Sequence, residues 1–245
     1  MIAGPNGSGK STIKSFIESK VSLIWGIYIN PDDIEKQIRD QGHLDLIKFD
    51  ITSTRTEIRT FFEKSVLLRN ARLMDCVNHL DYANGKLHFD SIHVNAYLAS
   101  VIAGFIRQKL LEKQVPFTFE TVMSSEDKIE FLKQAKENGY RTYLYYVATI
   151  DPEINIHRIR ERVRNGGHDV PKDKILSRYT RSLTLLWEAV RHSDRAFIFD
   201  NSSLEIELLA EITNGKILEI RSENIPQWFA AAILNKFHNP ITSRL

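Results

Sequence analysis

Short apolar runs alternate along this chain with stretches whose apolar residues recur every three or four positions. Runs of strand length cover residues 23–29, 117–121, 143–149 and 196–200, and the segments between them show helical spacing. Strands that alternate with helices form a parallel sheet with helices on both faces. The pattern therefore predicts a three-layer α/β fold for a single domain of residues 1–245.

Residues 43–92 do not follow this alternation. They carry helical patterns around Ile58, Phe61 and Phe62, followed by an Asn84-Gly85 turn. We interpret them as a mostly helical insertion, and the helical spacing resumes from Leu98. An insertion at this point is expected to govern access of the substrate, and the phenylalanine pair is expected to be buried core.

Composition is that of an ordinary globular protein, with 42% hydrophobic and 26% charged residues. A net charge of +2 gives no basic field for nucleic acid. The single cysteine, Cys76, excludes an internal disulfide and is expected to pack. No run of 18 apolar residues exists, so we expect no membrane span. We also expect no signal peptide and a cytoplasmic location, since a phosphate-binding sequence motif already begins at residue 4.

A complete phosphate-loop motif, GPNGSGKST, occupies residues 4–12. Its glycines allow successive backbone N–H groups to point at a polyphosphate, and a helix over residues 11–17 directs its positive end at the same anion. Lys10 reaches the outer phosphates and Ser11 is the expected Mg²⁺ ligand. The residues predicted to bind ATP or GTP are Gly4, Asn6, Gly7, Ser8, Gly9, Lys10, Ser11 and Thr12.

Two carboxylates, Asp32 and Asp33, directly follow the second apolar run and Pro31. Asp32 is the predicted catalytic base, because a carboxylate at the carboxyl end of a strand can take a proton from an attacking hydroxyl. Asp33 is a candidate for substrate binding, and the alternative for it is a helix N-cap.

Glu120 and Thr121 end the third apolar run. A carboxylate at the end of an apolar strand is costly unless it is paired. Glu120 is therefore predicted to bind a sugar hydroxyl or a Mg²⁺-bound water, with an arginine salt bridge as the alternative. Thr121 is a weaker substrate-binding candidate.

Two basic helices are predicted on either side of Gly166-Gly167, and together they form a candidate lid within residues 152–192. Asp151-Pro152 starts the first helix and Pro171 starts the second. Arg162 and Arg178 are the first choices for contacts with the transferring phosphoryl group, and Arg181 is a substrate-binding candidate. A solvated basic face is the alternative for about half of the lid arginines, which are Arg158, Arg160, Arg162, Arg164, Arg178 and Arg181. His168 lacks partners at metal-ligand spacing, so a structural or substrate-contact role is expected.

These motifs together resemble the zeta-toxin family of phosphate-loop kinases. The resemblance is carried by residues 4–12 (GPNGSGKST), 30–34 (NPDDI), 117–121 (FTFET), 162–171 (RVRNGGHDVP), 178–183 (RYTRSL) and 199–202 (FDNS). It implies a phosphate-loop kinase fold with a central five-stranded parallel sheet. It also implies ATP, Mg²⁺ and an antitoxin-like protein partner.

The resemblance further implies an acceptor and a role for particular residues. Characterised zeta toxins phosphorylate UDP-N-acetylglucosamine, so a nucleotide sugar is the implied acceptor. Asp32 matches the catalytic aspartate of the family, Glu120 matches the glutamate that binds the amino sugar, and Arg162 resembles the first lid arginine. The second lid arginine has no clean match, and Arg178 or Arg181 is its expected substitute.

Two other functions remain open on the sequence alone. One is a nucleotide-dependent switch with slow hydrolysis and a protein partner at residues 43–92. The other is a kinase for RNA or polynucleotide ends, which the near-neutral charge disfavours. Asp32 and Glu120 favour a small-molecule kinase, because a pure switch needs no carboxylates for an acceptor.

Overall fold

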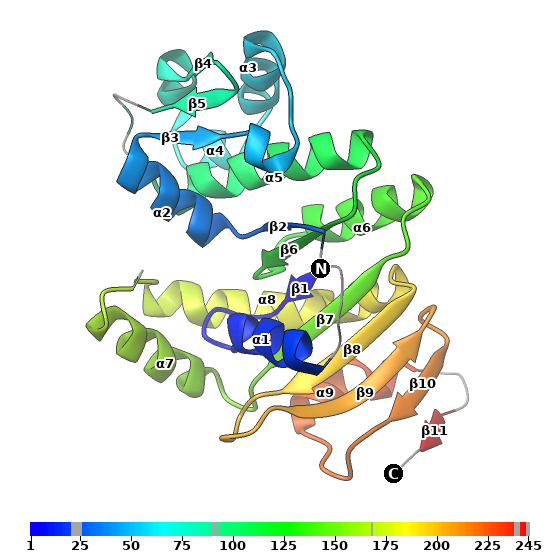
Figure 1. Ribbon diagram of the computed structural model, residues 1–245. Helices are drawn as coiled ribbons and strands as arrows, with labels where there is room; N and C mark the ends of the chain where they lie inside the picture. Colours follow the sequence, from blue (N-terminus) through cyan, green and yellow to red (C-terminus); the bar gives the residue numbers. More distant parts are fainter. Residues whose placement is uncertain (21–25, 90–91, 93, 168, 238–240, 244–245) are drawn as a thin grey trace. The chain divides into compact units, whose positions relative to one another are not determined.

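The protein is described by a computed structural model that covers residues 1–20, 26–89, 92, 94–167, 169–237 and 241–243 (Figure 1). The chain divides into two compact units. Unit 1 comprises residues 1–23 and 120–245, and unit 2 comprises residues 24–119. The strand β6 crosses the boundary between the units and contributes residues to both.

Unit 1 is built on a mostly parallel sheet. In it β1 pairs in parallel with residues 120–121 of β6 and with β7, and β7 pairs in parallel with β8. An antiparallel strand, β9, follows β8, and β10 and β11 extend the sheet further. The elements are β1 (Ile2–Ala3), α1 (Lys10–Lys20), β6 (Phe117–Thr121), α6 (Asp127–Glu137), β7 (Tyr143–Ala148), α7 (Pro152–Arg164), α8 (Lys172–Arg191), β8 (Arg195–Asp200), β9 (Glu207–Thr213), β10 (Ile217–Ile220), α9 (Gln227–Ala232), η3 (Leu234–Lys236) and β11 (Ile241–Ser243).

Side chains of a strand alternate between the two faces of its sheet, so apolar strands present apolar side chains on both faces. Helices cover both faces of this sheet. On β8, Phe199 meets Phe16 of α1 with ring centroids 6.3 Å apart. On the opposite face of the sheet, Tyr146 of β7 bonds Ser182 of α8, and its ring lies 6.3 Å from that of Trp228 in α9. Figure 1 shows α1 on one side of the strands and α8 and α9 on the other.

Unit 2 contains one parallel strand pair and a helical body. Residues 117–119 of β6 pair with β2, and α2 packs against α5. Its elements are β2 (Ile27–Ile29), α2 (Pro31–Gln41), β3 (His43–Asp45), η1 (Ile47–Phe49), α3 (Arg55–Glu63), α4 (Val66–Asn70), η2 (Met74–His79), β4 (Asp81–Ala83), β5 (Lys86–His88) and α5 (Ala96–Glu112). The predicted strand over residues 23–29 is seen from Ile27, and its residues 23–25 lie outside the described residues.

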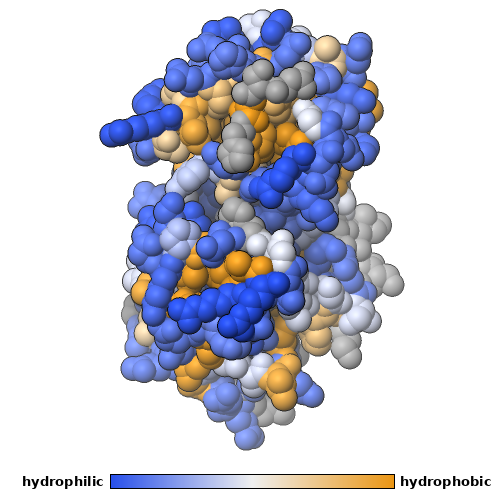
Figure 2. All heavy atoms as spheres, turned by 90° about the vertical axis from the view of Figure 1, so that its left-hand side faces the viewer, coloured by the Kyte–Doolittle hydropathy of each residue, from blue (hydrophilic) through white to orange (hydrophobic). Residues whose placement is uncertain are grey.

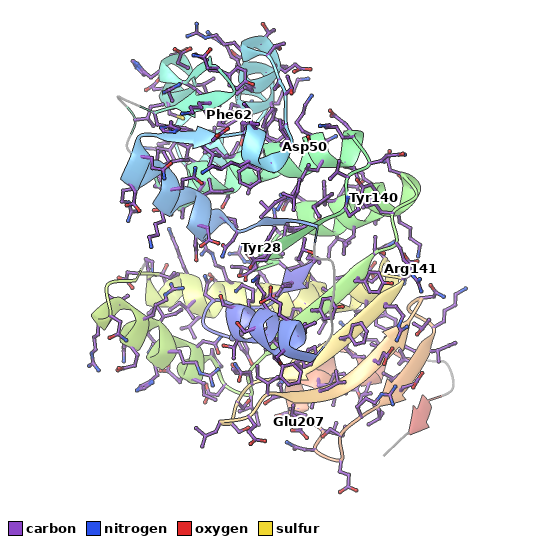
Figure 3. The ribbon with its side chains drawn as sticks, in the orientation of Figure 1. Tyr28, Asp50, Phe62, Tyr140, Arg141 and Glu207 are labelled. Carbon is purple, nitrogen blue, oxygen red and sulfur yellow. The ribbon has the colours of Figure 1, made fainter. Side chains whose placement is uncertain are left out.

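The segment 43–92 differs from the predicted helical insertion by a small sheet. In this sheet β5 lies between β3 and β4, and both pairings are antiparallel. The β4–β5 turn is formed by Asn84 and Gly85, both at positive φ. Strands of three residues are too short for period-two spacing to stand out in sequence, which is why helices alone were predicted. Phe62, labelled in Figure 3, is fully buried, and Phe61 packs edge-on against Phe105.

The predicted fold class is confirmed. The order β8-β7-β1-β6-β2 gives five parallel strands, four of which correspond to predicted apolar runs. The additional strands β9 to β11 were not predicted. None of the described helices combines the length and apolarity that a membrane crossing requires.

Candidate nucleotide site

The phosphate loop joins β1 to α1 and depends on glycine at three positions. Gly4, Gly7 and Gly9 have φ values of 150°, 76° and 98°, which other residues rarely adopt. Space is equally restrictive. A Cβ on Gly7 would lie 2.6 Å from the carbonyl oxygen of Asn155, and one on Gly9 would lie 2.1 Å from Nδ2 of Asn201. Asn155 and Asn201 therefore lie so close to the loop that only glycine fits at positions 7 and 9.

Lys10 is the first residue of α1, and its side chain folds back onto the start of the phosphate loop. Its Nζ donates hydrogen bonds to the carbonyl oxygens of Gly4 at 3.0 Å and Pro5 at 3.1 Å. Ser11 and Thr12 follow in the first turn of α1 and are exposed. A cation and the positive end of an 11-residue helix are thus brought to one loop, as the sequence predicts for a polyphosphate site.

Two asparagine side chains bond the loop backbone. Nδ2 of Asn155, in the first turns of α7, donates to the carbonyl oxygen of Asn6 at 2.7 Å. Nδ2 of Asn201, which follows β8, donates to the carbonyl oxygen of Ser8 at 2.8 Å. Neither asparagine was predicted as a site residue. Each lies far along the sequence from its partner, so no local spacing signalled the contact.

Asp200 is the last residue of β8, directly before Asn201, and is buried. Its carboxylate accepts hydrogen bonds from Nε1 of Trp228 at 2.8 Å and from the backbone N–H of Ser202 at 2.8 Å. Burial lowers the pKa of Arg158 and the charge of Asp200 opposes that lowering. Asp200 is therefore a negative charge that acts on Arg158, and no role for it was predicted from the sequence.

The lid arginines separate into two groups by burial. Arg158, Arg162 and Arg178 are half-buried, whereas Arg160, Arg164 and Arg181 are exposed. Among the described residues, one terminal nitrogen of Arg158 is buried without a hydrogen-bond partner. The exposed group fits the alternative of a solvated basic face.

Two consecutive residues of α8 contact the phosphate loop and the segment that follows β7. NH1 of Arg178 lies 3.4 Å from Oδ1 of Asn6, which brings this predicted arginine to the phosphate loop. The hydroxyl of Tyr179 donates to the carbonyl oxygen of Thr149 at 2.5 Å. Burial, with the charges of Asp151 and Asp200, raises the pKa of Tyr179 to about 12, so this donor keeps its proton.

Several helix boundaries of the lid agree with the predicted signals. Asp151 caps α7 by accepting from the backbone N–H of Glu153, and Pro152 is the first helical residue. The helix ends before Gly166, which has a φ of 81°, and α8 begins after Pro171. Figure 2 shows the side of unit 1 where α7 lies, with hydrophobic atoms among hydrophilic ones. The exposed hydrophobic residues of the two lid helices are Val163 and Leu176.

Glu120 and Thr121 lie at the end of β6, next to the start of the loop. Glu120 pairs in register with Ile2 and is 5% exposed. The carbonyl of Thr121 accepts from the N–H of Gly4 at 3.2 Å, and its hydroxyl accepts from the N–H of Met123 at 3.0 Å. Thr121 thus supports the loop and its own turn, whereas Glu120 is a buried carboxylate.

Asp32 and Asp33 belong to unit 2. The N-cap of α2 is Asn30, whose Oδ1 accepts from the N–H of Asp32 at 3.0 Å. The alternative of Asp33 as the N-cap was therefore wrong, since the cap falls one residue before Pro31. Asp32 is exposed in the first turn, where a carboxylate interacts favourably with the helix dipole.

Two predicted positions remain without structural support. His168 lies outside the described residues. Ser11 lies in the first turn of α1, and within the described part of the chain no three histidine, cysteine or carboxylate side chains gather as a separate metal site. Magnesium stays a prediction that depends on Ser11 and bound phosphates.

Comparison with known proteins supports the family named from the sequence. The family model described as Zeta toxin matches residues 89–205. The matched segment includes the strand β6, which carries Glu120, both lid helices and the Asp200-Asn201 segment. The resemblance drawn from the sequence motifs is thereby confirmed over the matched residues 89–205.

Individual proteins similar to this chain share less than a third of their residues with it. An uncharacterised protein of Haemophilus influenzae is 28% identical over 176 residues, which cover 72% of this chain and 88% of that protein. The AvrRxo1-ORF1:-ORF2 complex with ATP has a chain of similar fold, with a TM-score of 0.51 and 14% identity. That similarity covers 97% of this chain and 63% of the other. A structure from the PezAT toxin-antitoxin system of Streptococcus pneumoniae gives a TM-score of 0.48 and 16% identity, covering 98% of this chain and 79% of the other.

Proposed function

We propose that this protein is an ATP-dependent phosphotransferase that phosphorylates a hydroxyl group of a small molecule, with a nucleotide sugar such as UDP-N-acetylglucosamine as the acceptor. The observation that carries the proposal is the donor set around the phosphate loop. Within the described residues the backbone N–H groups of Gly7 and Gly9 donate to no other group, and Lys10 and Arg178 lie at the same loop. Such a set suits the β- and γ-phosphates of a nucleotide.

The residues of unit 1 supply electrostatic stabilisation. Lys10 would exchange its bonds to the loop carbonyls for the outer phosphates, and Ser11 would hold the Mg²⁺ ion. The half-buried Arg162 and Arg178 would spread positive charge over the transferring group, and Arg181 and His168 would contribute to binding the acceptor. When bound, Mg²⁺ supplies charge neutralisation between the phosphates.

Three carboxylates and one hydroxyl serve the acceptor. The acceptor oxygen forms a bond to the γ-phosphorus, the bond from that phosphorus to the β-γ bridging oxygen breaks, and ADP leaves. Asp32 takes the proton of the attacking hydroxyl, while Glu120, with Thr121 and Asp33, binds the sugar. The family and the solved AvrRxo1 complex, which contains ATP, support the choice of nucleotide.

Mass spectrometry tests this proposal. Purified protein is incubated with Mg²⁺, ATP and a panel of nucleotide sugars, and each acceptor is examined for one added phosphate. We expect one member of the panel to be phosphorylated, and only with ATP present. Hydrolysis of ATP with every acceptor unmodified would instead favour the nucleotide-dependent switch.

A further inference from the structure

We propose that Asn155 and Asn201 are positioning residues that hold the phosphate loop open for a polyphosphate by clamping two of its carbonyl groups. This inference rests on the proposed nucleotide site. Neither residue is assigned a contact with the phosphates. Both act through the backbone of the loop, from elements that follow the adjacent strands β7 and β8.

The first clamp is a chain of buried hydrogen bonds. Asn155 is fully buried, and its Nδ2 donates to the carbonyl oxygen of Asn6 at 2.7 Å. The hydroxyl of Thr149, also fully buried, donates to Oδ1 of Asn155. The carbonyl of Asn6 fixes the orientation of the amide, since a flipped amide would place its oxygen against the oxygen of Asn6, and the Thr149 hydroxyl anchors the Oδ1 end.

The second clamp comes from the end of β8. Asn201 is 6% exposed, and its own backbone N–H donates to the carbonyl oxygen of Ala148 at 2.9 Å. The side chain thus starts from a fixed point and donates to the carbonyl oxygen of Ser8 at 2.8 Å. Glycine at position 9 leaves room for the amide, because any Cβ there would clash with Nδ2.

The consequence follows from peptide geometry. In a trans peptide the C=O and the N–H point in opposite directions. The carbonyl of Asn6 shares its peptide unit with the N–H of Gly7, and the carbonyl of Ser8 shares its unit with the N–H of Gly9. Clamping both carbonyls therefore turns both N–H groups the other way, and in the described structure neither of them donates to another group.

The clamps are tested with Asn155→Ala and Asn201→Ala, using Mg²⁺-tripolyphosphate as a probe that binds through phosphates alone. Asn138→Ala is the matched control, since Asn138 makes a similar side-chain bond, from Nδ2 to the carbonyl oxygen of Gln134 at 2.8 Å, on the exposed end of α6. Affinity is measured by calorimetry, melting temperature by circular dichroism, and loop motion by hydrogen exchange of a peptide covering residues 4–12.

We expect each clamp variant to bind tripolyphosphate at least about tenfold more weakly, with faster exchange confined to the loop, and the control to match wild type. If an alanine variant does not fold, the nearly isosteric Thr149→Val, which frees the Asn155 amide, decides in its place. Folded variants with wild-type affinity and loop exchange would overturn the clamp alone. A wild-type protein that binds neither ATP nor tripolyphosphate would overturn the proposed function as well.

Discussion

Lys10 is the residue on which nucleotide turnover should depend most. Its ammonium bonds the loop carbonyls of Gly4 and Pro5, and its side chain is not part of the buried core. We predict that Lys10→Ala lowers phosphoryl transfer on the order of 10²-fold or more, because charge stabilisation supplies most of this catalysis. Steady-state transfer measured beside a melting curve checks this. Near-normal transfer would refute the assignment of the loop.

Asp32 should separate chemistry from nucleotide binding. We predict that Asp32→Asn abolishes acceptor phosphorylation and leaves the ATP dissociation constant unchanged, since the amide keeps the shape but accepts no proton. The cap of α2 is provided by Asn30, so the helix should survive the substitution. A matching loss of ATP affinity would place Asp32 on the Mg²⁺ ion instead.

At the residue scale, the sequence was informative where chemistry is local. The loop residues and the lid arginine Arg178 follow from spacing, and the structure brings them together. Asn155 and Asn201 could not be found in this way, because their partners are 149 and 193 positions away. The N-cap of α2 was misplaced because both Asn30 and the aspartates are good caps.

The two lid helices should close on nucleotide. Gly166 provides a left-handed residue between them, and the exposed Arg160, Arg164 and Arg181 offer sites for trypsin. We predict slower tryptic cleavage within residues 158–181 when ATP·Mg²⁺ and acceptor are present, because the arginines repel one another until phosphates bind. Cleavage after the exposed Arg69 of unit 2 is the internal control. Equal cleavage rates with and without ligand would identify a static basic face.

At the element scale, long or fully apolar segments were predicted well. The strands β6, β7 and β8 and the helices α5, α7 and α8 appear where apolar runs, caps and prolines indicate them. The strands β3, β4 and β5 were missed, since three residues give too little pattern. Strands β9 and β10 add antiparallel pairs, and β11 adds a parallel pair with β10, beyond the alternation that was used to find the fold.

At the scale of the whole molecule, the segment 43–88 should govern acceptor use and not nucleotide binding. The N–H of Phe89 donates to the carbonyl oxygen of Gly42 at 3.0 Å, so a short Gly/Ser linker can replace the segment between them. The phosphate loop and lid belong to unit 1. The deletion removes Phe61, which packs against Phe105, so Phe105 is also replaced by serine (Phe105→Ser) to avoid an uncovered aromatic ring. We predict that this deletion protein keeps its affinity for ATP and uses a different set of acceptors. A folded deletion protein that no longer binds ATP would contradict this.

The most direct test of the central claim is the ratio of phosphorylated acceptor to ADP formed in one reaction. A kinase couples the two products, so the account predicts a ratio close to one with the preferred nucleotide sugar, and loss of both products in Lys10→Ala. ATP that carries one label in the γ-phosphate and another in the adenine ring allows phosphorylated acceptor and ADP to be counted in the same sample. ADP accumulation that does not depend on the acceptor, with no labelled acceptor formed, would contradict the account.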